Sequence, residues 1–172
     1  MGKIICNLAM SLDGFIADEK GGVDWLNDYP PAGEDYGMTD FFQSCAVAIM
    51  GSKTYEQAVS FNSWFGDMEG YVFTSRQLKP FKNVVIKFFN GDPVPVVAEL
   101  RKKQKDSWLV GGAVLIADFI NHHLLDELII TVLPKMLGKG MPLCPGLNEI
   151  KKLELLESKQ YKDGVIQLKY KL

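Results

Sequence analysis

Short apolar runs alternate with segments of helical spacing along most of the chain. The runs are rich in β-branched residues and predict strands at 3–10, 46–50, 70–74, 83–86, 107–110, 126–133, 151–160 and 163–171. Between them, apolar residues that recur with the helical period predict helices at 38–45, 53–59, 94–105 and 113–123. Strands that alternate with helices are typical of a largely parallel sheet covered on both faces.

The last part of the chain follows a different pattern. Two alternating runs flank Lys162-Asp163-Gly164, where the Asp-Gly pair is a hairpin signal. We therefore expect an antiparallel hairpin to finish an otherwise α/β sheet. Neither a long linker nor an internal repeat interrupts the order of elements, so residues 1–172 are predicted to form a single domain.

The composition limits the kind of partner. Hydrophobic residues make up 47% of the chain and charged residues 23%, which are ordinary values for a globular protein. The formal net charge of −2 lacks the basic field expected of a nucleic-acid binder, so we expect a small-molecule ligand. The apolar N-terminal run meets Ser11, Asp13 and Gly14 too early for a signal peptide or a membrane span.

The cysteines and histidines indicate a reduced, metal-free protein. Three widely spaced cysteines, without any CxxC pattern, indicate free thiols and a cytoplasmic location. The two histidines, His122 and His123, are neighbours near the end of a predicted helix. Adjacent helical residues diverge by about 100° and cannot share one metal ion, so no metal site is expected.

Glycines stand at two predicted strand-to-helix junctions. In "WLVGGAVLIADFI" the pair Gly111 and Gly112 precedes a helix, and in "VAIMGSKTYEQA" Gly51 does the same. Free backbone N–H groups and the helix dipole make such a junction suitable for an anion. The alternative for each junction is a plain tight turn.

A third junction strengthens the case for a phosphorylated ligand. In "YVFTSRQL" the strand ends at Thr74, Ser75 and Arg76, which offer two hydroxyls and a guanidinium. The carboxyl ends of parallel strands line the crevice in which open α/β sheets bind ligands. Neither GxxxxGK[ST] nor GxGxxG after the first strand is present, so both standard nucleotide-binding motifs are disfavoured.

The motifs together resemble the dihydrofolate-reductase-like superfamily. "NLAMSLDGFIA", "AIMGSKTYE", "VFTSR", "WLVGGAVL", "LLDELIITVLPKMLGKG" and the closing hairpin occur in the order found there. The resemblance is strongest to stand-alone proteins related to the reductase domain of the bifunctional riboflavin-biosynthesis deaminase-reductase. It implies a three-layer α/β/α fold, a mixed, mostly parallel sheet of about eight strands, NADPH across the strand ends as hydride donor, and a homodimer.

The resemblance also implies roles for individual residues. The nicotinamide would lie between Ala9 and Ile16, and the adenosine 2′-phosphate would lie among Thr74, Ser75 and Arg76. The diphosphate would meet two segments, Gly51, Ser52, Lys53 and Thr54 on one side and Gly111, Gly112, Ala113 and Val114 on the other. In this superfamily the Gly-Gly peptide bond is typically cis.

The substrate side departs from the relatives. Asn7 occupies the position of a lysine in the pyrimidine reductases, and Ser52 that of an arginine common next to the 2′-phosphate. "GGVDWL" resembles a flexible loop, so Trp25 is expected to contact the substrate. Asp35, and secondarily Asp40, are candidates for the catalytic carboxylate; the alternative for both is capping of a helix.

Two classes of function remain from these observations. The first is an NADPH-dependent reductase that transfers a hydride to a small heterocyclic or carbonyl substrate. The second is a catalytically silent nucleotide- or flavin-binding protein on the same fold, which the missing substrate-side residues favour.

Overall fold

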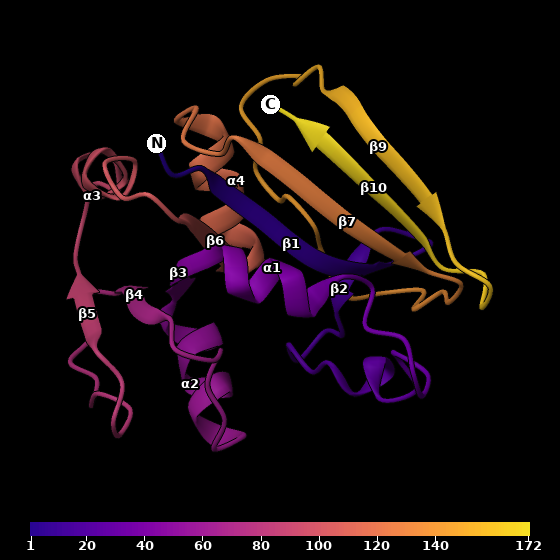
Figure 1. Cartoon of the computed structure of the whole chain (residues 1–172), viewed down its shortest axis with the longest axis horizontal. Coiled ribbons are helices and arrows are strands. Elements are labelled where there is room, and N and C mark those ends of the chain that lie inside the picture. The colour runs from indigo at the N-terminus through magenta and orange to yellow at the C-terminus, as the bar shows by residue number, and fades with distance from the viewer.

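One sheet of eight strands runs through the whole molecule (Figure 1). The computed structural model describes residues 1–172. In spatial order the strands are β5 (Ile86–Phe89), β4 (Glu69–Phe73), β3 (Cys45–Gly51), β6 (Asp106–Gly111), β1 (Ile4–Ser11), β7 (Glu127–Leu133), β10 (Ile166–Lys171) and β9 (Glu154–Gln160). The strands from β5 to β7 pair in parallel, and β10 pairs antiparallel with both β7 and β9. The predicted mixed sheet with its C-terminal hairpin is confirmed.

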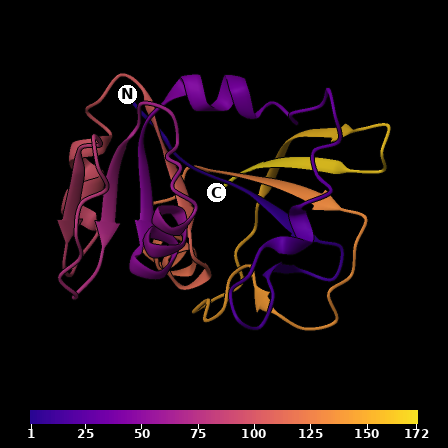
Figure 2. The ribbon, with the colours of Figure 1, turned by 90° about the horizontal axis from the view of Figure 1, so that it is seen from below.

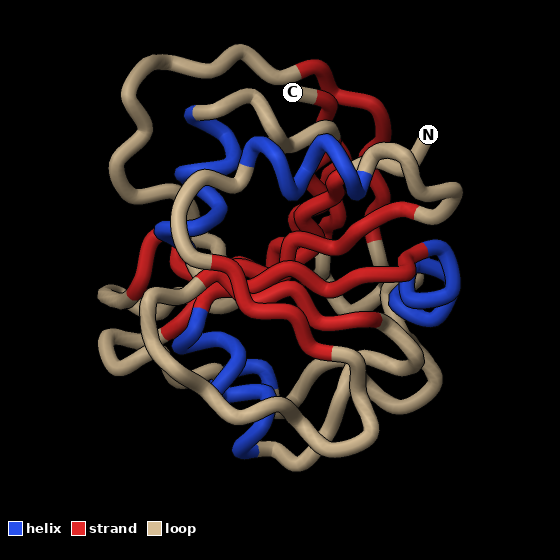
Figure 3. Tube along the Cα trace, turned by 90° about the vertical axis from the view of Figure 1, so that its left-hand side faces the viewer, coloured by secondary structure: helices blue, strands red, loops and turns tan.

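Helices cover both faces of this sheet (Figures 2 and 3). On one face lie α1 (Met38–Ser44) and α2 (Ser52–Ser60), and on the other lie α3 (Val94–Leu100) and α4 (Ala113–Asn121). Fully buried side chains join α4 to the strands, among them Ile116 and Phe119. Each such side chain contributes about 1.5–3 kcal/mol to the burial of apolar surface. The three-layer α/β/α architecture is therefore confirmed. All helices are too short, or not apolar enough, to span a membrane.

Local hydrogen bonds and backbone conformation move the ends of two predicted elements. The helix predicted to extend to 105 ends at Leu100, because the next amides bond three residues back, Lys102 to the Glu99 carbonyl and Lys103 to the Leu100 carbonyl. The strand predicted at 83–86 begins at Ile86, since Asn83 adopts a left-handed conformation with φ of 62°. Residues 101–105 are charged or polar and offer no apolar face to continue the helix.

A small second sheet was not predicted. It pairs β2 (Phe15–Ala17) with β8 (Met141–Pro142), and a single turn of 3₁₀ helix, η1 (Asp24–Leu26), follows β2. These elements are too short to carry a periodic pattern. They place the long loops 17–36 and 134–150 side by side at the carboxyl end of β1 and β7.

Asp13 joins two of the sequence motifs, SLDG and LGKG. Its carboxylate accepts hydrogen bonds from the Ser11 hydroxyl at 2.6 Å and from the backbone N–H groups of Leu137 at 3.0 Å and Gly138 at 2.7 Å. The Ser11 hydroxyl contributes most to holding the pKa of Asp13 below its usual value, followed by the two amides. Two motifs more than 120 residues apart thus form one hydrogen-bonded unit.

Replacing Asp13 by alanine should lower the melting temperature at neutral pH. The depressed pKa means that the carboxylate stabilises the fold above its ordinary pKa and that this contribution is lost as the pH falls through the folded-state pKa. We therefore expect the gap in melting temperature between wild type and Asp13→Ala to narrow between about pH 7 and about pH 3. The control is Asp67→Ala, because Asp67 is exposed and accepts no hydrogen bond. An equal gap at both pH values would contradict the role of the ionised carboxylate.

Candidate functional site

Four neighbouring parallel strands, β4, β3, β6 and β1, end at the same edge of the sheet. In register, Met50 pairs with Gly111 and Gly51 pairs with Phe73, so the segments that follow these strands lie next to one another. This edge carries the residues predicted for the cofactor: Ala9, Ile16, Gly51, Ser52, Lys53, Thr54, Thr74, Ser75, Arg76, Gly111, Gly112, Ala113 and Val114. The fold thus brings together segments that are up to about a hundred residues apart in the sequence.

Two helices begin side by side at this edge without a side-chain cap. Gly51 is the N-cap of α2 and Gly112 is the N-cap of α4, both in extended conformation, and no side chain bonds to either helix start. Their first-turn N–H groups therefore remain available, and both dipoles present their positive ends.

The two N-cap glycines face the space between these helix starts. A Cβ atom on Gly112 would lie 3.4 Å from Thr54 Oγ1, and one on Gly51 would lie 4.0 Å from the Gly111 carbonyl oxygen. Side chains at these positions would fill the space in front of the free amides. Two neighbouring uncapped helix starts offer free N–H groups of the kind that bind anions.

Gly111 has a different requirement from Gly112. Its φ of 117° lies in the region that favours glycine, and a Cβ atom there would lie 3.2 Å from Ile116 Cδ1. The Gly111–Gly112 peptide bond is cis, as the family resemblance implies. Gly111 is thus needed by the turn itself, whereas Gly112 borders the open space.

Arg76 lies beside α2. Its guanidinium donates two hydrogen bonds to the Glu56 carboxylate, Nη2 to Oε2 at 2.7 Å and Nη1 to Oε1 at 3.1 Å. The Arg76 backbone N–H donates to Thr74 Oγ1 at 3.0 Å, which fixes the turn after β4. About half of each side chain of the ion pair is exposed, so the pair adds little stability and an anionic ligand can compete for the guanidinium.

A cavity of about 220 Å³ opens between β1, β7, α1 and the loop 17–36. It is lined by Asn7, Leu8, Ala9, Leu26, Tyr29, Pro30, Tyr36, Met38, Trp108, Thr131 and Leu133. Because Ala9 belongs both to this lining and to the edge described above, the cavity adjoins the predicted cofactor site. Of the predicted substrate residues, only Asn7 lines it.

The loop that carries Trp25 is held over the sheet from two sides. Lys135 Nζ donates to the Trp25 carbonyl at 2.8 Å and to Asp28 Oδ2 at 2.9 Å, and Gln57 Nε2 donates to the Gly21 carbonyl at 3.0 Å. The Trp25 ring packs in a cluster around Leu133 and does not line the cavity, and its buried Nε1 has no hydrogen-bond partner. The loop contributes Leu26, Tyr29 and Pro30 to the cavity wall instead.

The structure does not bring the predicted catalytic carboxylates into the cavity. Asp35 accepts hydrogen bonds from the backbone N–H groups of Gly37 at 2.8 Å and Thr39 at 3.1 Å, at the start of α1. The Thr39 hydroxyl, followed by these amides, lowers the pKa of Asp35. Asp40 is exposed on α1, and neither carboxylate belongs to the lining. The geometry favours the capping interpretation of Asp35.

Several lining residues were missed by the sequence-based prediction. Thr131 is a polar residue within the apolar strand DELIITVL, and this interruption was a usable signal. Tyr36 had no such signal, because its place depends on a hydrogen bond from its hydroxyl to Asp163 in the β9–β10 turn. Burial, and then this hydrogen bond, raise the pKa of the Tyr36 phenol.

Comparison with known proteins agrees with this geometry. The family model described as "RibD C-terminal domain" matches residues 2–167. Uncharacterized protein YwjB of Bacillus subtilis (strain 168) is 37% identical over 171 residues, which cover 98% of this chain and 97% of that protein. A putative riboflavin biosynthesis protein from Shewanella sp. PV-4 superposes with a TM-score of 0.86 at 28% identity, covering 99% of this chain and 98% of the other.

The fold is also that of dihydrofolate reductase. The enzyme from Enterococcus faecalis, solved as a complex with NADP(H) and RAB-propyl, superposes with a TM-score of 0.67. The superposition covers 98% of this chain and 95% of the enzyme. At 16% identity this likeness shows the dihydrofolate-reductase-like fold alone.

Proposed function

Since the chain belongs to the RibD C-terminal domain family, we propose that it is an NADPH-dependent reductase that transfers a hydride to a small heterocyclic or carbonyl substrate. The pair of uncapped helix starts at Gly51 and Gly112, with the Arg76 guanidinium on the side of α2, is the observation that carries this proposal. Free amides and a guanidinium are the groups that bind the phosphates of a dinucleotide. NADP(H) bound to the dihydrofolate reductase of the same fold supports the choice of cofactor.

The residues present fit this cofactor. The first turns of α2 and α4 would hold the diphosphate, Thr74, Ser75 and Arg76 would hold the 2′-phosphate, and Ala9 and Ile16 would flank the nicotinamide. When bound, NADPH supplies the hydride and is oxidised to NADP⁺.

The protein contributes orientation and exclusion of water. The cavity beside Ala9 would hold the substrate ring, and the loop 17–36, fixed by Lys135 and Gln57, would cover it. No carboxyl group lines the cavity, so the proton that accompanies the hydride would come from water.

NADPH binding and oxidation test this function directly. We expect titration calorimetry to show NADPH binding, and a panel of pterins, pyrimidinones and quinones to include a compound that is reduced as NADPH is consumed. NADPH at a hundred times its dissociation constant should stabilise the fold by about 2.7 kcal/mol. Absence of binding by either NADPH or NADH would overturn the proposal.

The lack of an acidic group in the cavity favours one alternative, a catalytically silent nucleotide- or flavin-binding protein. Tight NADPH binding without turnover of any compound in the panel would indicate the nucleotide-binding form. A visible flavin spectrum in the purified protein would indicate the flavin-binding form.

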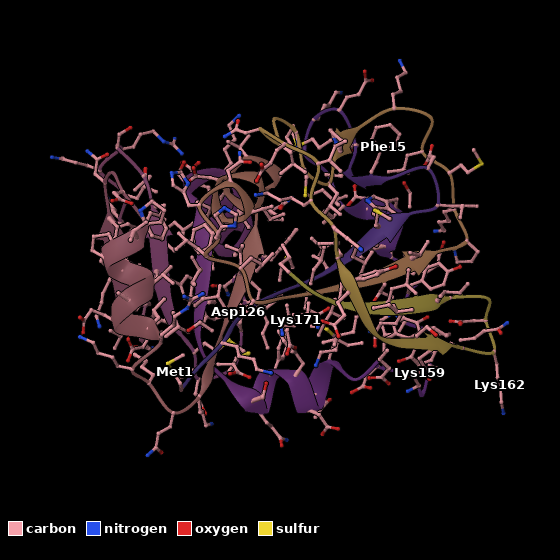
Figure 4. The ribbon with its side chains drawn as sticks, turned by 90° about the horizontal axis from the view of Figure 1, so that it is seen from above. Met1, Phe15, Asp126, Lys159, Lys162 and Lys171 are labelled. Carbon is pink, nitrogen blue, oxygen red and sulfur yellow. The ribbon has the colours of Figure 1, made fainter.

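A homodimer belongs to the same proposal. Leu155 of β9 and Ile166 of β10 are 53% and 44% exposed. Both lie on the α4 side of the sheet, because Leu155 pairs with Tyr170 and Ile166 pairs with Val132. An apolar cavity of about 620 Å³ on this side is bordered by Leu128, Ile130 and the nearly fully exposed Ile150. An apolar surface of this kind is typical of an interface, and β9 is an uncovered edge strand next to it (Figure 4).

Light scattering at micromolar concentration should therefore return about twice the 19.2 kDa mass of one chain. Ile166→Lys should shift the protein toward monomer, since it places a charge within the proposed contact. The control is Lys162→Ala at the tip of the hairpin, which should stay dimeric (Figure 4). A single-chain mass for the wild-type protein would contradict the prediction.

A further inference from the structure

The segment between β5 and α3 contains the single Asn-Gly pair of the chain. Asn90 and Gly91 directly follow Phe89, the last residue of β5. An asparagine in front of a glycine can react with its own backbone, because the side-chain carbonyl carbon and the next backbone nitrogen can close a five-membered ring. Glycine favours this closure, since it has no Cβ atom to obstruct the approach of its nitrogen.

Hydrogen bonds do not restrain the reacting groups of this pair. Both residues are exposed, and the Asn90 side-chain amide has no hydrogen-bond partner in the protein. The Gly91 N–H donates to no carbonyl group, so the attacking nitrogen is free. Gly91 has a φ of 105° and open space where a Cβ atom would stand, so neighbouring atoms leave room for the ring.

Asn121 at the end of α4 has the opposite arrangement. Its Nδ2 donates to the Gly146 carbonyl at 3.1 Å, and its Oδ1 accepts from the Asn148 N–H at 3.0 Å. The N–H of the next residue, His122, donates to the Asp118 carbonyl at 3.1 Å. Because both the side chain and the following nitrogen are bonded, Asn121 is an internal control for Asn90.

Asn90 stands next to the segment proposed for the 2′-phosphate. In the parallel pair β4 and β5, Phe73 pairs with Phe89, and the Thr74 N–H donates to the Phe89 carbonyl at 2.8 Å. Asn90 and Thr74 therefore leave the sheet side by side at the same edge. Neighbouring strands lie about 4.8 Å apart, so a charge at position 90 acts on this segment within one Debye length of about 8–10 Å.

We propose that Asn90 is a site of spontaneous deamidation, which places a negative charge beside the 2′-phosphate site. The Gly91 nitrogen bonds to Asn90 Cγ, the bond from Cγ to Nδ2 breaks, and Nδ2 leaves as ammonia with the proton that the Gly91 nitrogen loses. Water then opens the ring at one of its two carbonyl carbons and gives aspartate or isoaspartate. Neither step needs an enzyme or an oxidant.

The new carboxylate lowers the preference for NADPH. It repels the 2′-phosphate of NADPH, whereas NADH has no phosphate at this position. Solvent surrounds the exposed side chain and screens the repulsion, so the expected loss of NADPH affinity is modest, about threefold at low salt. The modification itself is independent of the proposed reductase function, and only its effect on NADPH rests on that function.

Peptide mass mapping tests the modification without any cofactor. The purified protein is kept for several weeks at neutral and at alkaline pH. The peptide that contains Asn90 should gain one mass unit, faster at alkaline pH, because hydroxide removes the Gly91 amide proton. The peptide that contains Asn121 should keep its mass, and Asn90→Gln should stop the change, since its longer side chain would have to close a six-membered ring. No gain at Asn90, or an equal gain at Asn121, would overturn the inference.

Fluorescence titration of Asn90→Asp tests the effect on the cofactor. This variant carries the charge of the deamidated protein and should bind NADPH about threefold more weakly at low salt, with NADH unchanged. The difference should shrink at high salt. The control is Asn62→Asp, which places the same charge beyond the far end of α2 and should change neither cofactor. Equal weakening of both cofactors, or no weakening of NADPH, would overturn the link to the 2′-phosphate.

The outcomes for the inference and for the proposed function are separate. A mass gain at Asn90 in a protein that binds neither NADPH nor NADH would support the modification and overturn the proposed reductase function. NADPH binding in a protein whose Asn90 peptide keeps its mass would support the proposed function and overturn the inference.

Discussion

Gly112→Ala should abolish most NADPH binding and leave the fold nearly intact. The protein accommodates the methyl group, since its nearest neighbour would be Thr54 Oγ1 at an ordinary contact distance of 3.4 Å and the φ of −77° suits any residue. The same methyl group would stand in the space between the starts of α2 and α4 and separate a diphosphate from the free amides. Loss of two charge-assisted hydrogen bonds corresponds to a fall in affinity of about a hundredfold. NADPH titration and thermal melting of the same sample measure both effects.

Two neighbouring variants serve as controls for Gly112→Ala. Gly111→Ala should lower the melting temperature, because it places a side chain at a φ of 117° and against Ile116. Ala113→Gly adds no atoms and should retain NADPH affinity while losing some stability within α4. If Gly112→Ala melted early but bound NADPH like the parent, Gly112 would serve only as a turn residue.

Arg76→Ala should weaken NADPH binding by about tenfold or more and leave NADH binding unchanged. The 2′-phosphate that distinguishes the two cofactors is a bidentate partner for a guanidinium. Position 52 is a serine, so no second arginine there can replace Arg76. The ratio of the two dissociation constants, measured by fluorescence titration, reports this preference. Equal weakening of both cofactors would contradict the assignment of Arg76 to the 2′-phosphate.

Glu56→Gln complements Arg76→Ala, because it changes the partner of the same guanidinium. In the structure the Glu56 carboxylate occupies both hydrogen-bonding edges of the guanidinium, at 2.7 Å and 3.1 Å. A neutral amide holds the guanidinium less strongly, so Glu56→Gln should tighten NADPH binding and increase the preference over NADH. Glu56→Gln in the Arg76→Ala background should have no such effect, since the guanidinium is then absent.

The order of strands and helices was determined by local pattern. The run CAVAIMG is buried from both faces and is therefore continuously apolar, and ELIITVL is apolar except at Glu127 and Thr131. The Asp-Gly turn is a local signal for the closing hairpin. The glycine junctions at Gly51 and Gly112 were predicted for the same reason, because conformational demands on one or two residues are visible in the sequence.

The composition of the cavity was decided only by the tertiary structure. Asn7, Trp108 and Thr131 lie on β1, β6 and β7, and they meet because β1 pairs with both β6 and β7. Tyr36 joins them from the loop before α1, where its hydroxyl donates to Asp163. Asp35 was the first candidate for the catalytic carboxylate, yet its carboxylate accepts hydrogen bonds from backbone N–H groups at the start of α1. Sequence spacing places a side chain on an element, whereas the competing local hydrogen bonds decide where that side chain points.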